Sequence, residues 1–319
     1  MSSVGTARSP VRRDVPSTGG KRILVKQVDA FTETPLAGNP AGVVVDASGL
    51  SDHQMQMIAH ELAAPETAFI LPTSRRGANL RIRWFSPATE VPLCGHATIA
   101  AFHALAEEKM HGMSTPGNYS FVLETLSGNL PLTVEKRKEG AFVFFGLNVP
   151  VFVRAGQYKM DIMRLLGISL QDLENRLPIV ADKYLYVPVR RLHSLHSIKP
   201  NMFALSRFLT GKNLGGLCVF TLETVEKTSA VHSRFFAPNL GVDEDVVTGS
   251  ANGPLGVYLF QQGYLKHTGK VVTLTGEQGD VLGRKGRVTV ELTLQGNEVQ
   301  SVRIGGRAVT VMTAGMLIG

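Results

Sequence analysis

The sequence has 319 residues, which suffices for two ordinary domains or one large one, and it is 44% hydrophobic and 18% charged. This composition excludes a disordered chain and predicts a well-packed globular protein. The formal net charge of +7 does not indicate nucleic-acid binding, because residues 1–22 hold five basic residues against Asp14 and so supply +4 of it. The rest of the chain has no stripe of Arg and Lys interleaved with aromatic residues.

The two cysteines, Cys94 and Cys218, are too few for a disulfide framework, and no Cys-x-x-Cys pair offers zinc ligands. No apolar run approaches the ~20 residues of a membrane span. Residues 1–20 lack the apolar core of a secretory signal. We therefore expect a soluble, cytoplasmic protein, with a disordered tail over residues 1–20. A targeting segment and an expression remnant are the alternatives for that tail.

We expect the folded part of the chain to begin at residue 21. The alternation and turn residues of the first half predict strands over 23–31, 43–45, 67–71, 80–85, 119–125, 130–136 and 141–147. A helix capped by Ser51 or Asp52 ends before Pro65 and leaves Glu66 at a helix-to-strand corner. A second helix begins near Gly95 and carries almost no charge before Glu107, which predicts a buried helix.

The second half repeats this plan. A helix is predicted near 161–166 and 172, and a second apolar helix over 249–261. Strands are predicted near 183–189, 217–224, 270–275, 280–282, 286–294 and 298–305. The segment 306–313 is expected to return to the first half.

Two segments of the chain share the same pattern of residues. Arg83-x-Phe-x-Pro leads through an acidic loop to Cys94-Gly95-His96-Ala97, and Arg234-x-Phe-x-Pro leads through another to Thr248-Gly249-Ser250-Ala251. Each segment places a strand, a proline, a loop and then a glycine at the start of a buried helix. The repeat predicts two pseudo-symmetric halves with a site between them.

The two helix starts are candidate anion sites. The first turn of a helix offers unpaired backbone N–H groups and the positive end of the helix dipole. Gly95 and Gly249 would let a ligand carboxylate approach that backbone closely, without a metal ion. The alternative is that each glycine only permits tight packing of its helix.

Glu66 is the acid/base candidate. Its neighbours in sequence are apolar, so partial burial would raise its pKa toward neutrality. On spacing alone, a helix-end glutamate with a salt-bridge partner is the favoured interpretation.

Four further residues flank the helix starts. His96 is expected to be neutral at a helix N-terminus, and Cys94 can be acidified by the same helix end or be an inert buried thiol. Asp245 can orient a partner and Ser250 can donate a hydrogen bond, or the two can form an ordinary cap. No Gly-x-Ser-x-Gly elbow surrounds Ser250.

Signatures of other functions are missing from the sequence. It has no dinucleotide fingerprint, no phosphate-binding Walker loop and no histidine pair with metal spacing. His193 and His196 are three residues apart, but no third ligand is near them in sequence. We therefore predict no cofactor and no metal.

Five motifs in order resemble the phenazine-biosynthesis PhzF family, which has the diaminopimelate epimerase-like fold, and within it the uncharacterised bacterial members. They are Val28-Asp29-Ala30-Phe31, Ala37-Gly38-Asn39-Pro40-Ala41-Gly42, Pro65-Glu66-Thr67-Ala68-Phe69, Cys94-Gly95-His96-Ala97-Thr98 and Glu244-Asp245-Val246-Val247-Thr248-Gly249-Ser250-Ala251-Asn252. The resemblance covers roughly residues 22–318.

The resemblance implies an α+β fold of two pseudo-symmetric domains, each a curled β-sheet or barrel around a central helix, and commonly a homodimer. We place one domain at 21–135 with 306–319 and the other at 136–305.

The resemblance further implies a cofactor-independent isomerase acting on a small carboxylic-acid or amino-acid-like substrate. Glu66 matches the acid/base, and the residues that assist it are His96, Asp245 and Ser250, with Cys94 beside them. The implied substrate-binding residues are Asn39, Gly95, Ala97, Thr248, Gly249 and Ala251.

One position departs from the related epimerases, which carry a cysteine before each helix glycine. Cys94 matches the first cysteine, but Thr248 stands at the second. Because a threonine hydroxyl cannot act as a base near neutrality, symmetric two-thiol racemisation is not expected. A one-cysteine dehydratase, lyase or racemase-like enzyme using Cys94 is the second hypothesis, and a non-catalytic binding protein on the same fold is the third.

Overall fold

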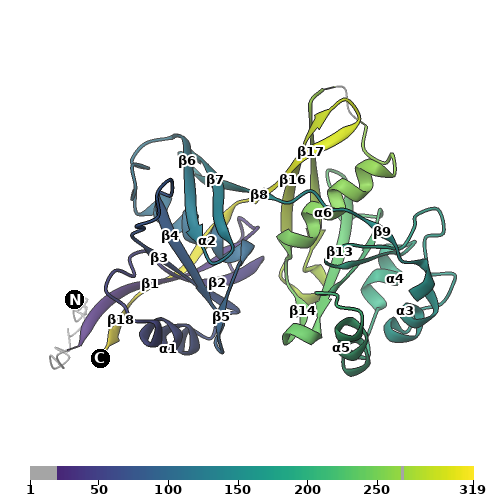
Figure 1. The fold of residues 1–319 in the computed structure, drawn as a ribbon, viewed down its shortest axis with the longest axis horizontal. Helices are drawn as coiled ribbons and strands as arrows, with labels where there is room; N and C mark the ends of the chain where they lie inside the picture. Colours follow the sequence, from purple (N-terminus) through teal and green to yellow (C-terminus); the bar gives the residue numbers. More distant parts are fainter. Residues whose placement is uncertain (1–19, 267–268) are drawn as a thin grey trace, which may run out of the picture.

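The computed structural model describes residues 20–266 and 269–319, so the tail predicted for residues 1–20 lies outside the described residues except for Gly20. Figure 1 shows two lobes side by side, one holding helix α2 (Gly95–Glu107) and the other helix α6 (Gly249–Gln261). In the described part of the chain, no helix has the length and apolarity needed to cross a membrane.

The first lobe is a curled sheet around α2, with a second helix, α1 (Asp52–Leu62), between two of its strands. Its strands are β1 (Lys21–Ala30), β2 (Asn39–Val44), β3 (Glu66–Leu71), β4 (Leu80–Phe85), β5 (Glu90–Val91), β6 (Gly117–Thr125), β7 (Gly128–Arg137) and β8 (Gly140–Leu147). Helix α1 (Asp52–Leu62) joins β2 to β3 and begins at Ser51, whose hydroxyl accepts from the Gln54 N–H. Strand β2 pairs parallel with β3, β4 pairs parallel with β6, and β3–β4 and β6–β7–β8 are antiparallel.

The second lobe repeats this pattern of pairing. Its elements are β9 (Val153–Arg154), α3 (Lys159–Leu166), β10 (Val180–Ala181), β11 (Leu185–Pro188), α4 (Leu192–Ser197), α5 (Met202–Gly211), β12 (Leu217–Thr221), β13 (Val231–Ala237), β14 (Val242–Asp245), β15 (Val271–Gln278), β16 (Gly286–Gln295) and β17 (Glu298–Gly306). Here β11 is parallel to β12 and β13 to β15, while β12–β13 and β15–β16–β17 are antiparallel. The matching order confirms the pseudo-symmetric α+β fold.

Two strands tie the lobes together. Strand β8 pairs with β7 in the first lobe and with β17 in the second, so the sheet runs on from one lobe to the other. Strand β18 (Ala308–Ile318) returns to pair antiparallel with β1, as expected for the segment after residue 306. The sheet curls around the central helices without closing (Figure 1). The domain limits at 135/136 and 305/306 stay predictions.

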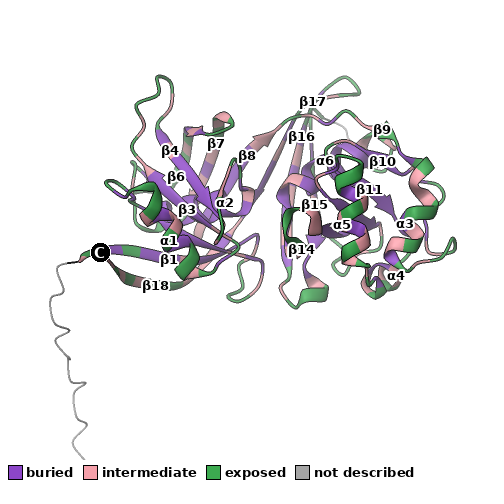
Figure 2. Ribbon diagram, turned by 60° about the horizontal axis from the view of Figure 1, so that its bottom comes forward, coloured by how far each residue is buried: buried purple, intermediate pink, exposed green. Residues whose placement is uncertain are grey.

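Helices α2 and α6 form the centres of the two lobes. Residues 96–106 of α2 are all buried, in agreement with their lack of charge. Figure 2 shows the same concentration of burial along the strands that face α2 and α6. Each fully buried large apolar side chain, such as Ile99 or Phe102, contributes about 1.5–3 kcal/mol, so α2 is held in place by its packing and its first turn is fixed relative to the sheet.

The repeated arginine of each half has the same structural task. Arg83 on β4 donates to both carboxylate oxygens of Glu90, each at 2.7 Å. Arg234 on β13 does the same with Glu244, each at 2.8 Å. These fork-like pairs are geometrically specific, and they fasten the loop that leads into each central helix.

Two predicted elements are wrong. Residues 280–282 form a 3₁₀ turn, η3 (Asp280–Leu282), because Gly279 and Gly283 on either side adopt φ values of 88° and 70° that a strand cannot accommodate. Asp172 lies outside a helix, since its carboxylate accepts from both the N–H and the hydroxyl of Ser169 in a turn. The short 3₁₀ turns η1 (Gly156–Tyr158) and η2 (Pro238–Leu240) and the helices α4 and α5 were not predicted from the sequence.

Candidate active site

A cavity of about 660 Å³ lies between the lobes and is lined by residues of both. Eight side chains that can donate, accept or transfer a proton are among those that line it: Asn39, Glu66, Cys94, His96, Tyr184, Asp245, Thr248 and Ser250. Among the described residues that line it, none is Lys or Arg. The cleft is therefore a place where a ligand anion must be held by backbone groups or neutral donors.

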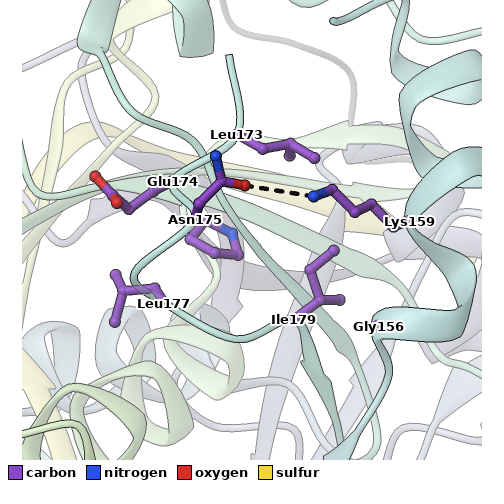
Figure 3. A pocket seen from close by; sticks show the side chains of 8 residues that line it. Gly156, Lys159, Leu173, Glu174, Asn175, Leu177 and Ile179 are labelled. Carbon is purple, nitrogen blue, oxygen red and sulfur yellow. Dashed lines mark hydrogen bonds between the residues drawn. The ribbon is translucent and has the colours of Figure 1, made fainter. Parts of the chain in front are cut away.

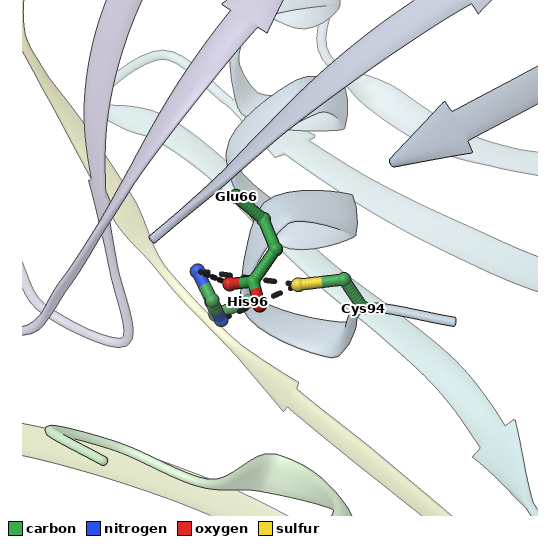
Figure 4. A group of neighbouring side chains, drawn as sticks. All are labelled: Glu66, Cys94 and His96. Atoms are coloured by element: carbon green, nitrogen blue, oxygen red, sulfur yellow. Dashed lines mark hydrogen bonds and ion pairs between the residues drawn. The ribbon is translucent and has the colours of Figure 1, made fainter. Parts of the chain in front are cut away.

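Three of these side chains converge at the start of α2. Glu66 is the first residue of β3, Cys94 is the residue before α2, and His96 is the second residue of that helix. The His96 Nε2 lies 3.3 Å from Glu66 Oε2, and the Cys94 Sγ lies 3.5 Å from His96 Nδ1 and 4.0 Å from Nε2. Figure 4 shows the three side chains pointing toward one another.

Burial sets the protonation of Glu66 and His96. It raises the pKa of the Glu66 carboxyl, with a smaller opposing effect from the Cys94 thiol. It lowers the pKa of the His96 imidazole, against the opposing charge of Asp245. His96 is thus neutral near pH 7, as expected, although burial is the main cause and not the helix end. A carboxyl group with a raised pKa and a neutral imidazole in contact can pass a proton.

The pKa of the Cys94 thiol is raised, whereas the helix end alone would lower it. Burial raises it well above its ordinary value, and the negative charge of Glu66 adds to this effect. The N–H of Ala97 opposes the shift but is outweighed. A thiol that keeps its proton is a poor nucleophile, so this finding disfavours the one-cysteine mechanism.

Asp245 faces the triad of Glu66, Cys94 and His96 from the second lobe. It accepts hydrogen bonds from Asn39 Nδ2 at 2.8 Å and from the Thr248 hydroxyl at 2.6 Å. Burial raises the pKa of Asp245, and His96 and these donors only partly offset that shift. Thr248, which departs from the two-cysteine pattern, therefore acts here as a hydrogen-bond donor to a buried carboxylate.

The two central helices both open toward the cavity without a capping side chain. No side-chain cap hydrogen bond is made at the start of α2 or of α6. Gly95 and Gly249 line the cavity, but a Cβ on Gly95 would lie 2.9 Å from Phe145 and one on Gly249 would lie 2.3 Å from Ile304. The glycines are thus required by packing against the core, and the uncapped N–H groups are what a ligand can use.

Not every predicted residue reaches the cavity. Ala97 and Ala251 are fully buried and do not line it.

Two residues that were not predicted belong to the site. The Tyr184 hydroxyl lies 3.0 Å from the Ser250 Oγ, and Gln278 donates to Thr248 Oγ1 and to the Asp245 carbonyl. Neither residue lies in a motif, so no sequence signal marks it.

A smaller cavity of about 120 Å³ lies in the second lobe, between α3 and the loop before β10 (Figure 3). Its main polar contact joins Lys159 Nζ to Asn175 Oδ1 at 3.3 Å. Glu174 also lines it but is paired with Arg176, and the cavity contains none of the predicted site residues.

His196 gains a neighbour that its sequence position did not indicate. The fold brings His232 Nε2 to 3.4 Å from His196 Nε2, and Asp280 Oδ2 to 3.9 Å from the same His232 atom. Glu277 holds the other nitrogen of His232, Nδ1, at 2.8 Å. These residues come from separate elements, α4, β13, η3 and β15, which explains why spacing alone missed the cluster.

The fold is shared with a solved epimerase of low sequence identity. A hydroxyproline epimerase from Agrobacterium vitis, solved with trans-4-OH-L-proline bound, has the same fold, with a TM-score of 0.57 over 93% of this chain and 91% of that one. The two sequences are 13% identical, so this likeness concerns the fold alone. The chain therefore has the epimerase-like architecture that its motifs led us to expect.

The sequence matches the family described as phenazine biosynthesis-like protein over residues 28–314, and the chain belongs to this family. It is 35% identical, over 92% of its length and 97% of the relative's, to an uncharacterised isomerase from Clostridium acetobutylicum. A crystal structure of a PhzF-family phenazine biosynthesis protein from Bacillus anthracis aligns with a TM-score of 0.82 at 33% identity, covering 93% of this chain and 100% of that one. The family and its relatives support an isomerase-type enzyme.

Proposed function

We propose that this protein moves a proton next to the carboxylate of a small acid, with Glu66 as the general acid/base. The observation that carries the proposal is the meeting of Glu66, His96 and two uncapped helix starts in one interlobe cavity. A carboxyl group whose pKa is raised by burial is suited to taking and returning a proton near neutral pH.

The reaction requires only proton movement. Ionised Glu66 takes a proton from the carbon next to the substrate carboxylate, and the electron pair left behind is delocalised into that carboxylate. The proton then returns to the opposite face of the same carbon by way of His96, or to a carbon that a double bond conjugates with it, so the substrate is isomerised with no net change in protons or electrons. No organic cofactor and no metal is needed for this sequence of steps.

His96, Asp245 and Ser250 have supporting roles in this scheme. His96, in contact with Glu66, relays or repositions the proton. Asp245 lies on the opposite lobe and polarises His96. Ser250 is held by Tyr184 and can donate to a substrate oxygen. We assign these residues as positioning groups around one principal base.

The uncapped starts of α2 and α6 would hold the substrate carboxylate. Because the described lining contains no Lys or Arg, backbone N–H groups and the helix dipoles are the available donors. Such preorganised donors are worth about 3–4 kcal/mol when negative charge develops on the oxygen that they bind. An amino group on the substrate would be compatible with the nearby carboxylates of Glu66 and Asp245, which favours small carboxylic and amino acids.

A panel of small carboxylic and amino acids incubated with the protein in D₂O tests this function. We expect mass spectrometry to detect deuterium at the carbon next to the carboxylate in at least one compound. Compounds that bind tightly but exchange no hydrogen would contradict catalysis and indicate a binding protein.

A further inference from the structure

Glu66, Cys94 and His96 offer three different ligand types at one point. One carboxylate oxygen, the thiol sulfur and one ring nitrogen lie within 4.8 Å of one another. Two of the three residues lie at the start of α2, whose position is fixed by its buried packing, and the third begins β3 beside it. The ligand set is therefore largely preformed (Figure 4).

The separations fit a tetrahedral zinc ion. With ordinary zinc bonds to nitrogen, oxygen and sulfur, a tetrahedral angle places N and O about 3.4 Å apart and S and N about 3.6 Å apart. In this site the His96 Nε2 lies 3.3 Å from Glu66 Oε2 and 4.0 Å from Cys94 Sγ. Binding therefore requires the Cys94 sulfur to move about 0.4 Å closer to His96 Nε2.

The surroundings favour a cation. Asp245 also lines the cavity, whereas no described Lys or Arg does. The arginines of the two matching segments are paired with other acids, Arg83 with Glu90 and Arg234 with Glu244. A dication would thus compensate the partly buried carboxylates of Glu66 and Asp245, which have no Lys or Arg partner among the described residues that line the cavity.

We propose that Glu66, Cys94 and His96 form a three-ligand site for a soft divalent cation, best matched by Zn²⁺, with the fourth position open to the cleft. On binding, the thiol releases its proton to solvent and the sulfur coordinates the metal, without oxidation or reduction. The bound ion occupies the lone pairs of Glu66 and His96, so it blocks the proton transfer proposed above. Metal binding itself does not depend on that function.

The cluster around His196 is the competing metal site. Its two imidazole nitrogens lie 3.4 Å apart, which also suits a metal, but Asp280 is already paired with Arg287 at 3.1 Å. It contains no sulfur ligand. A probe that reports sulfur coordination therefore separates the two sites.

Titration of the reduced full-length protein with Co²⁺ gives that probe, because a thiolate–cobalt bond produces a charge-transfer absorption in the near ultraviolet. We expect this absorption to saturate at one equivalent, to be absent in Cys94→Ala and Cys94→Ser, and to be unchanged in Cys218→Ala, which removes the other buried cysteine. Glu66→Gln and His96→Ala should weaken Zn²⁺ binding, measured by chelator competition, by at least the factor of about 10–100 that is lost when a residue that only orients a metal ligand is changed.

His196→Ala completes the test and should leave the absorption and the first Zn²⁺ affinity unchanged. Absorption that persists in both Cys94 variants, with circular dichroism showing them folded, would overturn the proposal. So would Zn²⁺ affinity that falls in His196→Ala and not in Cys94→Ala. A wild-type protein that shows no sulfur-to-metal absorption at saturating Co²⁺ would also overturn it.

Discussion

At the scale of single residues, Glu66 is distinguished by its lack of a basic partner. Among the described residues, no Lys or Arg forms the salt bridge favoured by spacing alone, and Glu66 instead contacts His96 in the cleft. Because that imidazole is mostly neutral, it does little to stabilise the ionised carboxylate. Burial therefore dominates and raises the pKa of Glu66, which is the property that an acid/base group needs.

This raised pKa links Glu66 to stability. Above the ordinary pKa of 4.5 the unfolded chain releases the Glu66 proton, while the folded chain retains it up to its higher pKa. Over that window the folded state binds more protons, so the free energy of unfolding falls as the pH rises. We expect Glu66→Gln to stabilise the protein by about 0.5–2 kcal/mol at pH 7.5, with a smaller gain near pH 4.5.

Urea unfolding at the two pH values measures this effect. Glu61→Gln on the exposed face of α1 is the matched control and should change stability little at either pH. A Glu66→Gln protein that is less stable than the wild type at pH 7.5 would show that the carboxylate is stabilised in the fold and not penalised by burial.

At the scale of elements, the central helices were the best predicted part of the chain. Helix α6 has the predicted bounds, because the segment that follows Gly249 carries no charged residue and is almost entirely buried. The turn η3 and the pKa of Cys94 could not be predicted, because both depend on neighbours supplied by other elements. Glu66 itself was selected through family resemblance, since its local sequence favoured a different role.

The start of α6 is sensitive to an added methyl group. A Cβ at Gly249 would meet Ile304 at 2.3 Å and Phe31 at 3.0 Å, both in the core. We expect Gly249→Ala to cost about 1–3 kcal/mol of stability and to weaken substrate binding, because the helix start must shift. Thermal unfolding and the KM of any substrate found would report the two effects.

Gly211→Ala provides the control, since Gly211 closes α5 and has open space around it. This variant should be unchanged or slightly more stable, because alanine has the higher helix propensity. Equal losses in Gly211→Ala and Gly249→Ala would contradict a special packing constraint at the active-site helix.

At the scale of the whole molecule, the lobes are fastened beside the cleft. Asn39 on β2 donates to Asp245 and to the Val247 carbonyl of the other lobe. Arg284, from the second lobe, donates to Asp29 at 2.7 Å and to the Gly38 carbonyl at 2.9 Å. These contacts set the distance between the two helix starts, on which a shared carboxylate site depends.

Removal of Arg284 should therefore weaken the connection. Asp29 is 1% exposed, and Arg284→Ala leaves its carboxylate buried without a charged partner. We expect a loss of about 3 kcal/mol in the free energy of unfolding, and partial recovery when Asp29→Asn is added. Urea unfolding of both single variants and the double variant tests this. Strictly additive losses would show that the pair does not couple the lobes.

The pseudo-symmetry of the molecule was visible in the sequence, because Arg83 and Arg234 begin matching segments and each proved to hold the acidic loop before its helix. The closeness of His96 to Asp245 was not visible, since it depends on how the lobes meet. The homodimer implied by the family resemblance stays a prediction.

The most direct test of the account is the rate of deuterium incorporation from D₂O into a responsive substrate by the wild type and by Glu66→Gln. If Glu66 is the principal acid/base, the variant should exchange at least about 100-fold more slowly while remaining folded. Exchange at the wild-type rate in Glu66→Gln would show that another group moves the proton.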